Sequence, residues 1–283
     1  MNIAIDTGGT FTDIILYDMK KSAFWTDKIP SNPENPENPF IDGLIGILKL
    51  SGHSKNEVNN LIHGTTIVTN SIIEGNVAKV GLLVTEGFRD LLEIGRQQRP
   101  DLYDLKKGRK ASLVRRDLVG EIRERVSSNK KVILPIDKKQ SLAQIKTLKK
   151  KNIDTLAISL LFSFYQPIHE RTLEKLAQKM FDKRHVFISS RVSPEFREFE
   201  RTSTTVIAAA VAPKVVNYIS SIRTKLSAQV MDHVRMRIMH SGGGTLETTE
   251  AEERPHALIE SGPAAGVVGA AYLSKKLNLN QVL

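Results

Sequence analysis

The stretch that decides the fold of this chain is Asn2-Ile3-Ala4-Ile5-Asp6-Thr7-Gly8-Gly9-Thr10-Phe11-Thr12-Asp13-Ile14-Ile15-Leu16-Tyr17-Asp18. A short apolar run ends in a carboxylate at Asp6. Two adjacent glycines and two hydroxyl side chains follow, and then a second apolar run begins. This order predicts a strand, a tight Gly-Gly turn and a second strand.

The predicted turn is open to two interpretations. Glycine permits the backbone angles and the close approach that an anion-binding turn needs, and the hydroxyls of Thr7 and Thr10 would add donors to its backbone N–H groups. Asp6, at the strand end, is placed to hold a hydrated Mg²⁺, because hard cations prefer oxygen ligands. The alternative is a β-hairpin with a surface aspartate and no ligand. The stretch has no Gly-Lys-Ser/Thr sequence and no third glycine opening a helix, which excludes a Walker loop and a dinucleotide fingerprint.

The composition is that of a globular protein with one large domain or two of ordinary size, at 283 residues, 40% hydrophobic and 25% charged. The absence of cysteine excludes disulfides, thiolate metal sites and a cysteine nucleophile, and it fits a cytoplasmic location. The longest apolar runs, residues 156–162 and 205–212, are shorter than the roughly 20 residues that span a bilayer. No signal-peptide pattern is present, so no membrane partner is expected.

The formal charge of +10 raises the question of nucleic-acid binding. The basic residues are spread along the whole chain, and the cluster Lys149-Lys150-Lys151 ends a predicted helix whose apolar positions face the other way. Aromatic residues are not interleaved with the basic clusters, as stacking on single strands would require. We therefore expect the basicity to serve solubility and small anionic ligands, with no nucleic-acid partner.

The remaining pattern predicts an α/β protein. Strands are expected at residues 3–6, 12–17, 23–28, 79–85 and 234–239, and helices at residues 40–48, 67–74, 194–228 and 257–273. Strands alternate with helices between residues 132 and 190, which predicts a parallel-rich sheet, whereas residues 87–129 are expected to be irregular. Pro213 predicts a kink or break in its helix. The expected division is residues 1–190 and 191–283.

Several separated blocks carry a resemblance to a known family. They are Asp6-Thr-Gly-Gly-Thr-Phe-Thr-Asp13, His63-Gly-Thr-Thr-Ile-Val-Thr-Asn70, residues 87–104, Ser261-Gly-Pro-Ala-Ala-Gly-Val-Val-Gly269 and Glu200-Arg-Thr-Ser-Thr-Thr-Val206. Across essentially all 283 residues, the chain resembles the hydantoinase A / 5-oxoprolinase family. That family includes N-methylhydantoinase A and the ATP-using subunits of acetone and acetophenone carboxylases.

The resemblance implies an actin-like ATPase fold, as in sugar kinases and heat-shock chaperones, with an N-terminal lobe, an additional βαβαβ segment and an incomplete second lobe. It implies that residues 6–10 form the first phosphate loop and that the small-residue helix at 262–271 connects the lobes. It also implies ATP and Mg²⁺ as cofactors and phosphorylation of a small-molecule substrate, a cyclic amide (hydantoin or 5-oxoproline) or a ketone. Ring hydrolysis or carboxylation would follow, with a hydantoinase B-type partner subunit. Homo-oligomer formation stays open.

The chain departs from the family pattern in one respect. Family members carry a second Asp-x-Gly-Gly-Thr loop shortly after the Gly-Pro-Ala-Ala-Gly helix, and this sequence has none. The turn Ser241-Gly-Gly-Gly-Thr245 is no substitute, because no acid precedes its glycines. We therefore expect an N-terminal portion of a longer enzyme, truncated before the second loop, and no turnover by this chain alone.

The candidate site residues follow from these blocks. The catalytic candidates are Asp6, which is also the Mg²⁺ candidate through water, His63 and Arg96. The cofactor-binding candidates are Thr7, Gly8, Gly9, Thr10, Thr12, Gly242 and Gly243. Thr12 and Asp13 would orient the turn or simply begin the second strand. Gly242 and Gly243 would approach a nucleotide or form a plain turn.

Other candidates carry equally open alternatives. His63 would be an electrophile or proton donor near substrate, or a histidine hydrogen-bonded at a strand end. Arg96 would clamp a carboxylate or phosphate, or pair within an irregular loop. The same choice applies to Arg89, Arg99 and Asp101. Thr65, Thr66 and Asn70 would line a cleft or cap the helix beginning near Ile67, with Thr66 favoured as the cap. Glu200, Arg201 and Thr202 are expected to make structural contacts.

Two rival functions remain open at this stage. One is a small-molecule kinase of the same fold, and the other is a non-catalytic assembly module. A transition-metal site is not expected, because the seven histidines are scattered and none pairs at i, i+4 with an acid between.

Overall fold

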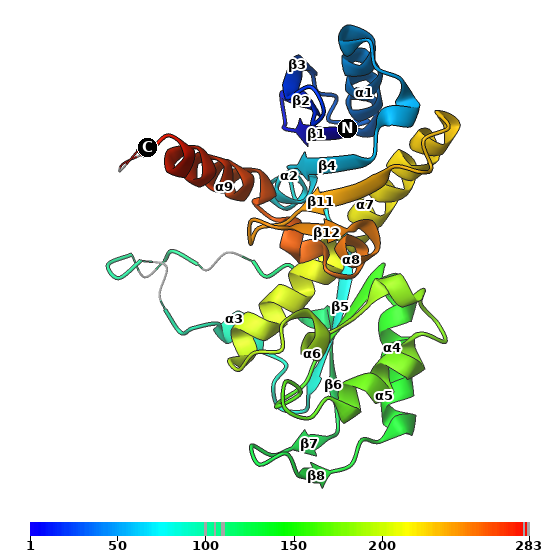
Figure 1. The fold of residues 1–283 in the computed structure, drawn as a ribbon. Helices are drawn as coiled ribbons and strands as arrows, with labels where there is room; N and C mark the ends of the chain where they lie inside the picture. The colour runs from blue at the N-terminus through cyan, green and yellow to red at the C-terminus, as the bar shows by residue number, and fades with distance from the viewer. Residues whose placement is uncertain (99–100, 105, 109–110, 280, 282–283) are drawn as a thin grey trace. The chain divides into compact units, whose positions relative to one another are not determined.

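The computed structural model describes residues 1–98, 101–104, 106–108, 111–279 and 281. The chain forms two compact units (Figure 1), each described by itself. Unit 1 comprises Met1–Asn76 and Lys214–Leu283, and unit 2 comprises Val77–Pro213. Unit 1 is built from two separate segments because strands from both segments pair in one sheet.

Unit 1 is built on a six-stranded mixed sheet in the order β12-β11-β4-β1-β2-β3. Its strands are β1 (Asn2–Thr7), β2 (Phe11–Asp18), β3 (Ala23–Pro30), β4 (Asn60–Thr65), β11 (Arg235–Met239) and β12 (Thr245–Glu247). The first three strands are antiparallel, as are β11 and β12, whereas β4 is parallel to both β1 and β11. The strand–turn–strand prediction for the opening stretch is therefore confirmed.

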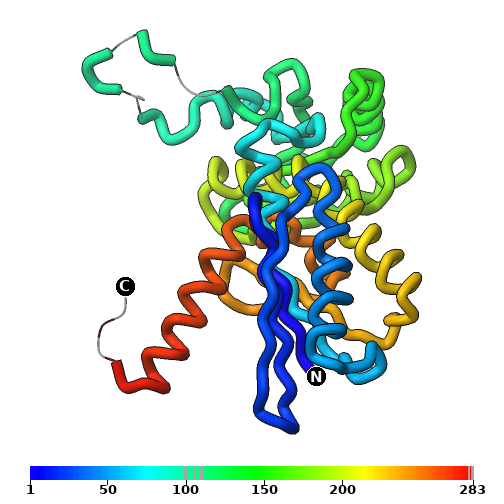
Figure 2. Tube along the Cα trace, turned by 90° about the horizontal axis from the view of Figure 1, so that it is seen from above, coloured from blue at the N-terminus to red at the C-terminus, as the bar shows by residue number. Residues whose placement is uncertain are grey.

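The burial pattern explains why the opening strands form a sheet. In β2 the odd-numbered residues are exposed and the even-numbered ones are buried, which is the period of a strand with one covered face. Helix α1 (Glu37–Ser51) packs on β1, β2 and β3 and lies alongside the hairpin (Figure 2). At the contact, an added Cβ on Gly43 would lie 2.7 Å from Cδ1 of Ile14, so only glycine permits this approach.

The other helices of unit 1 are η1 (Lys55–Glu57), α2 (Ile67–Ile73), α8 (Thr248–Glu253), η4 (Pro255–Leu258) and α9 (Ser261–Lys276). Glycines with positive φ follow α1 and α2, namely Gly52 at +70° and Gly75 at +69°. Helix α9 begins later than expected, because residues 255–258 form a separate 3₁₀ turn, and it runs outward from its sheet (Figures 1 and 2). Added Cβ atoms on Gly262, Gly266 and Gly269 meet nothing within 4 Å in the part described, so these three glycines make no close contact there.

Unit 2 is built on a four-stranded parallel sheet in the order β10-β9-β5-β6. Its strands are β5 (Val80–Thr85), β6 (Val119–Ile122), β9 (Thr155–Ser159) and β10 (Val186–Ile188), and β7 (Arg125–Val126) pairs with β8 (Val132–Leu134) in a separate hairpin. Its helices are α3 (Leu91–Ile94), η2 (Arg116–Leu118), α4 (Lys138–Lys150), α5 (Ile168–Ala177), η3 (Lys183–His185), α6 (Ser189–Val192) and the first half of α7 (Glu198–Ala228). The predicted parallel-rich sheet is confirmed.

Two details of the unit 2 prediction are wrong. The strand expected at residues 132–135 does not enter the parallel sheet. Its side chains stay largely outside the core, with Val132 42% and Ile133 66% exposed. The parallel sheet instead contains β6, which comes from a segment expected to be irregular. The sequence did not predict β6 because its apolar pattern, with Val119 and Ile122 buried, is only four residues long.

A kink or a break was predicted at Pro213. Helix α7 continues through Pro213, so the helix is not broken there. By length and composition α7 is apolar enough to cross a membrane. In the structure 67% of that apolar window is buried inside the protein, as is typical of a core helix in a soluble protein. Alanines 208–210 and 212 of α7 belong to the core of unit 2.

Candidate functional site

The turn between β1 and β2 is closed by a hydrogen bond from Gly8 N to Phe11 O of 3.0 Å. The register pairs Thr7 with Thr12 and Asp6 with Asp13. Since successive side chains of a strand point to opposite faces, the turn presents Asp6 on one face of the sheet and Thr7 on the other.

The neighbour of Asp6 on the adjacent strand β4 is a glycine, so no side chain there crowds the Asp6 carboxylate. Asp6 pairs with Gly64 of β4, where an added Cβ would come within 2.5 Å of the Asp6 Oδ1. Partial desolvation and, second, the charge of Asp13 raise the pKa of the Asp6 carboxyl. Asp13 itself pairs with Lys28 at 2.9 Å. A carboxylate in these surroundings is suited to a hydrated cation, whose charge would relieve the repulsion between the two acids.

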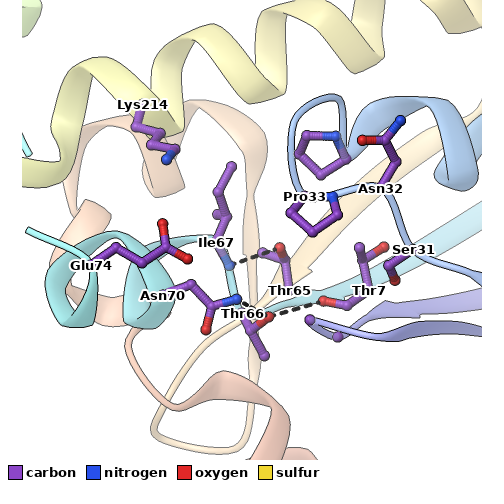
Figure 3. Close-up of a pocket in the computed structure, with 13 residues that line it drawn as sticks. Thr7, Ser31, Asn32, Pro33, Thr65, Thr66, Ile67, Asn70, Glu74 and Lys214 are labelled. Carbon is purple, nitrogen blue, oxygen red and sulfur yellow. Dashed lines mark hydrogen bonds between the residues drawn. The ribbon is translucent and has the colours of Figure 1, made fainter. Parts of the chain in front are cut away.

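Thr7 faces a pocket in unit 1 that we call the turn pocket (Figure 3). The pocket is lined by Thr7, Gly8, Gly9, Ser31, Asn32, Pro33, Pro36, Thr65, Thr66, Ile67, Asn70, Glu74 and Lys214. The Thr7 hydroxyl is buried and makes no hydrogen bond of ordinary geometry. Gly8 and Gly9 are part of the pocket wall, and because glycine has no side chain a ligand could approach their backbone closely.

Thr10 and Thr12 hold the turn in place. Thr12 is buried, and its hydroxyl is 2.9 Å from the Ser31 hydroxyl. The carbonyl of Thr10 accepts a hydrogen bond from Ser31 N at 2.9 Å. Thr12 thus has the orienting geometry that was one of its two alternatives.

His63 is completely buried between β1 and α7. Its Nδ1 lies 3.0 Å from Ile5 O and its Nε2 lies 2.8 Å from the Tyr218 hydroxyl. Burial lowers the pKa of His63 to about 4, so at neutral pH Nδ1–H donates to the carbonyl and Nε2 accepts from the phenol. This geometry fits the hydrogen-bonded alternative and leaves no ring nitrogen for a substrate.

Tyr218 links His63 to the turn pocket, because its hydroxyl bonds to His63 and lies near Thr65 and Thr7. Burial raises the pKa of its phenol, while the nearby hydroxyls of Thr65 and Thr7 lower it. Both threonines line the pocket. His63 therefore sits one residue behind the pocket wall, where it orients Tyr218.

The helix cap differs from its prediction. Thr66 occupies the N-cap position of α2, but its hydroxyl is directed to Thr7 O at 3.4 Å and makes no cap. The hydroxyl of Thr65 accepts from Ile67 N at 3.2 Å instead. Asn70 Nδ2 donates to the Thr66 hydroxyl at 3.2 Å. The Thr66 side chain is drawn away because a strand carbonyl lies within reach.

The second glycine-rich turn joins β11 to β12. Gly242 N donates to His240 Nδ1 at 3.0 Å, and Gly243 has a φ of +81°. Added Cβ atoms would lie 2.7 Å from the His240 ring and 2.7 Å from Val268 Cγ2 respectively. Local turn geometry is sufficient to require both glycines, which agrees with the plain-turn alternative.

The arginine candidates belong to unit 2. Arg96 pairs with Glu200 at 2.7 Å, and Arg89 donates to Arg116 O at 3.2 Å. Arg99 lies outside the described residues. Arg201 is buried and donates to Ser189, to Glu195 O and to Leu160 O, which is the structural role expected for it.

The sequence interpretation missed the two charged residues that line the pocket, Glu74 and Lys214. It also missed Tyr218, which lies behind the pocket wall next to Thr65 and Thr7. Lys214 was visible as a charge within an otherwise apolar helical run, but nothing local tied it to a strand more than 140 residues earlier. Its side chain points into the turn pocket (Figure 3).

Comparison with known families gives two matches. The model described as "Hydantoinase/oxoprolinase N-terminal region" matches residues 2–181, and the one described as "Hydantoinase/oxoprolinase" matches residues 201–283.

Curated relatives cover nearly the whole chain. An uncharacterized protein of Methanocaldococcus jannaschii is 37% identical over 99% of this chain and 41% of its own length. Caprolactamase subunit alpha of Pseudomonas jessenii is 31% identical over 99% and 41% respectively. 5-oxoprolinase 1 of Arabidopsis thaliana is 32% identical over 95% and 23%. The chain thus spans less than half the length of these relatives.

Two solved structures are similar over 98% of this chain and 41% of their own. The ATP-dependent caprolactamase from Pseudomonas jessenii has a TM-score of 0.86 at 30% identity. Nucleotide-free acetone carboxylase has a TM-score of 0.85 at 26% identity. These matches confirm the predicted actin-like ATPase fold.

Proposed function

The chain belongs to the hydantoinase/oxoprolinase family, and from that premise we propose that it is the ATP-using N-terminal part of a longer enzyme. The reaction would be phosphorylation of a small cyclic amide or ketone, followed by ring hydrolysis or carboxylation. Relatives named as an ATP-dependent caprolactamase, a 5-oxoprolinase and an acetone carboxylase favour this class.

The observation that carries the proposal is the Gly-Gly turn between β1 and β2, which has Asp6 on one face of the sheet and Thr7 on the other. Phosphoryl transfer depends on positioning and on stabilising charge. The backbone of Gly8 and Gly9 would approach the transferring phosphate, with the hydroxyls of Thr7 and Thr10 as further donors. Asp6 stands on the opposite face, where Gly64 leaves space for its carboxylate.

The residues present fit a hydrated Mg²⁺. Asp6 and Asp13 occupy paired positions, and partial desolvation together with the charge of Asp13 raises the pKa of Asp6. In the described residues no three His, Cys, Asp or Glu side chains gather, so water would complete the ligand set. Bound there, the cation would neutralise phosphate charge, and Asp6 would hold it through water.

A partner subunit is part of the proposal. Caprolactamase subunit alpha is by its name one subunit of an assembly. We expect the longer protein containing this chain to act with a hydantoinase B-type partner.

The test is the Asp6→Asn substitution in the complete enzyme. The amide keeps the size of the side chain and removes its charge, so ATP-dependent turnover should be abolished. Asp182→Asn, an exposed carboxylate in unit 2 paired with Arg184, is the matched control and should leave turnover unchanged. Near-normal turnover by Asp6→Asn would remove Asp6 from the site.

A further inference from the structure

Unit 1 contains another cavity, which we call the β11 cavity, at the end of its sheet away from the Gly-Gly turn. Arg235 lines this cavity at the start of β11 and pairs with Asn60, as does Asn2 at the start of β1. The Gly-Gly turn follows the other end of β1. The β11 cavity measures about 370 Å³, which is in the size range of small-molecule pockets, and it shares no residue with the turn pocket.

The buried part of the cavity lining is apolar. Four residues form it, each at most 8% exposed, namely Leu226, Met231, Val234 and Met236. Methionine side chains are unbranched and flexible, so they adapt to the shape of a ligand. This part of the lining can therefore bury an aliphatic chain, and the removal of that chain from water favours binding.

Asp232 supplies a carboxylate at the exposed edge of the cavity. It makes no hydrogen bond, and no ion pair within 4.0 Å, with any residue that the structure describes. A hydrogen bond of 3.1 Å from Val234 N to Met231 O closes a turn around Asp232. Arg235 follows three residues later, so the two Cα atoms are at most about 11 Å apart. An unpaired carboxylate and a guanidinium group thus lie near each other at this edge.

The arginines beside the cavity carry more positive charge than their partner neutralises. Glu247 Oε1 accepts from Arg235 Nη2 at 2.7 Å and from Arg237 Nε at 3.0 Å, so two guanidinium groups share one carboxylate. Nη1 of Arg235 donates to none of the described residues, and 58% of this side chain is exposed. Arg223 is balanced by Glu252, 2.9 Å away. The surplus positive charge at Arg235 is therefore available to a ligand.

We infer that the β11 cavity binds an α-amino acid with an aliphatic side chain. The carboxylate of the ligand accepts from the Arg235 guanidinium, and its ammonium group donates to the Asp232 carboxylate. Hydrogen bonds between charged groups are the strong ones, and a zwitterion forms both at once. The aliphatic side chain packs on the apolar lining. This site is separate from the turn pocket, and the inference does not depend on the proposed function.

The test compares four ligands on the complete protein without ATP, by ligand-observed NMR titration. L-leucine has both charges and an aliphatic side chain. 4-Methylpentanoate lacks the ammonium group, 3-methylbutylamine lacks the carboxylate, and glycine lacks the side chain. L-leucine should bind about tenfold more tightly than each of the others, because each loses a charge-assisted hydrogen bond or the burial of the chain. Equal affinities for the four ligands, or no saturable binding of L-leucine, would overturn the inference.

Two substitutions assign the two charges. Asp232→Asn should remove the preference for L-leucine over 4-methylpentanoate, and Arg235→Gln should remove the preference over 3-methylbutylamine. Both side chains are exposed, so neither substitution should prevent folding. Asp42→Asn is the matched control, because it changes an exposed carboxylate on α1 that does not line the cavity, and both preferences should remain. A preference that survives its own substitution would contradict the assignment.

Discussion

Replacing Gly64 with alanine places a methyl carbon against the Asp6 carboxylate. The added Cβ would lie 2.5 Å from Oδ1 and 3.2 Å from Cγ of Asp6, whereas ordinary contact begins at 3.4 Å. The carboxylate oxygen must therefore move by about 1 Å, and a displacement of about 1 Å can cost about 100-fold in rate. We expect kcat/KM of the complete enzyme to fall about 100-fold, which is about 2.7 kcal/mol of transition-state stabilisation.

The stability of the fold should change much less. Asp6 is exposed, so its side chain can rotate away from the new methyl group, and the melting temperature should fall only slightly. The assay is ATP-dependent turnover of wild type, Gly64→Ala, Asp6→Ala and the double variant. Because alanine at position 6 removes the carboxylate, the second substitution should add little to Asp6→Ala. Normal turnover of Gly64→Ala, or full additivity in the double variant, would refute the reasoning.

Two further predictions concern the buried pair behind the turn pocket. Tyr218→Phe leaves His63 Nε2 without its donor, so the free energy of unfolding in urea should drop by about 1–3 kcal/mol, and an unchanged value would contradict the hydrogen bond. Burial lowers the pKa of His63 from 6.5 to about 4, so the unfolded chain binds more protons between these values. The stability that neutral His63 provides is fully present above about pH 6.5 and is lost as the pH falls toward 4, by about 3 kcal/mol in total. His63→Gln should flatten this pH dependence of the unfolding free energy, and an unaltered slope would assign it to other groups.

Local patterns were sufficient for the opening of the chain. The alternation of buried and exposed residues in β2 acts through neighbours in sequence, so the opening strands were predicted correctly. The Gly-Gly turn was recognisable for the same reason. The reason for a glycine at position 64 became visible only in the pairing of β1 with β4. A side chain on residue 64 would collide with the Asp6 carboxylate.

Contacts between distant segments account for what the sequence could not reveal. His63 bonds to Tyr218 across 155 residues, which no pattern around His63 indicates. Lys214 and Glu74 meet at one pocket only after the two ends of the chain join in one unit. In unit 2, β6 was missed because its four residues carry too short an apolar pattern, and β8 was misassigned because its apolar residues stay exposed.

The central claim is that the substrate oxygen is phosphorylated by ATP at the site containing the Gly-Gly turn. The most direct measurement uses the complete enzyme and a cyclic amide that it turns over, labelled with ¹⁸O at the carbonyl. If the carbonyl oxygen is phosphorylated and its bond to carbon then breaks, ³¹P NMR should show ¹⁸O in the released phosphate, one label for each ring opened. Release of unlabelled phosphate during ring opening would contradict the account.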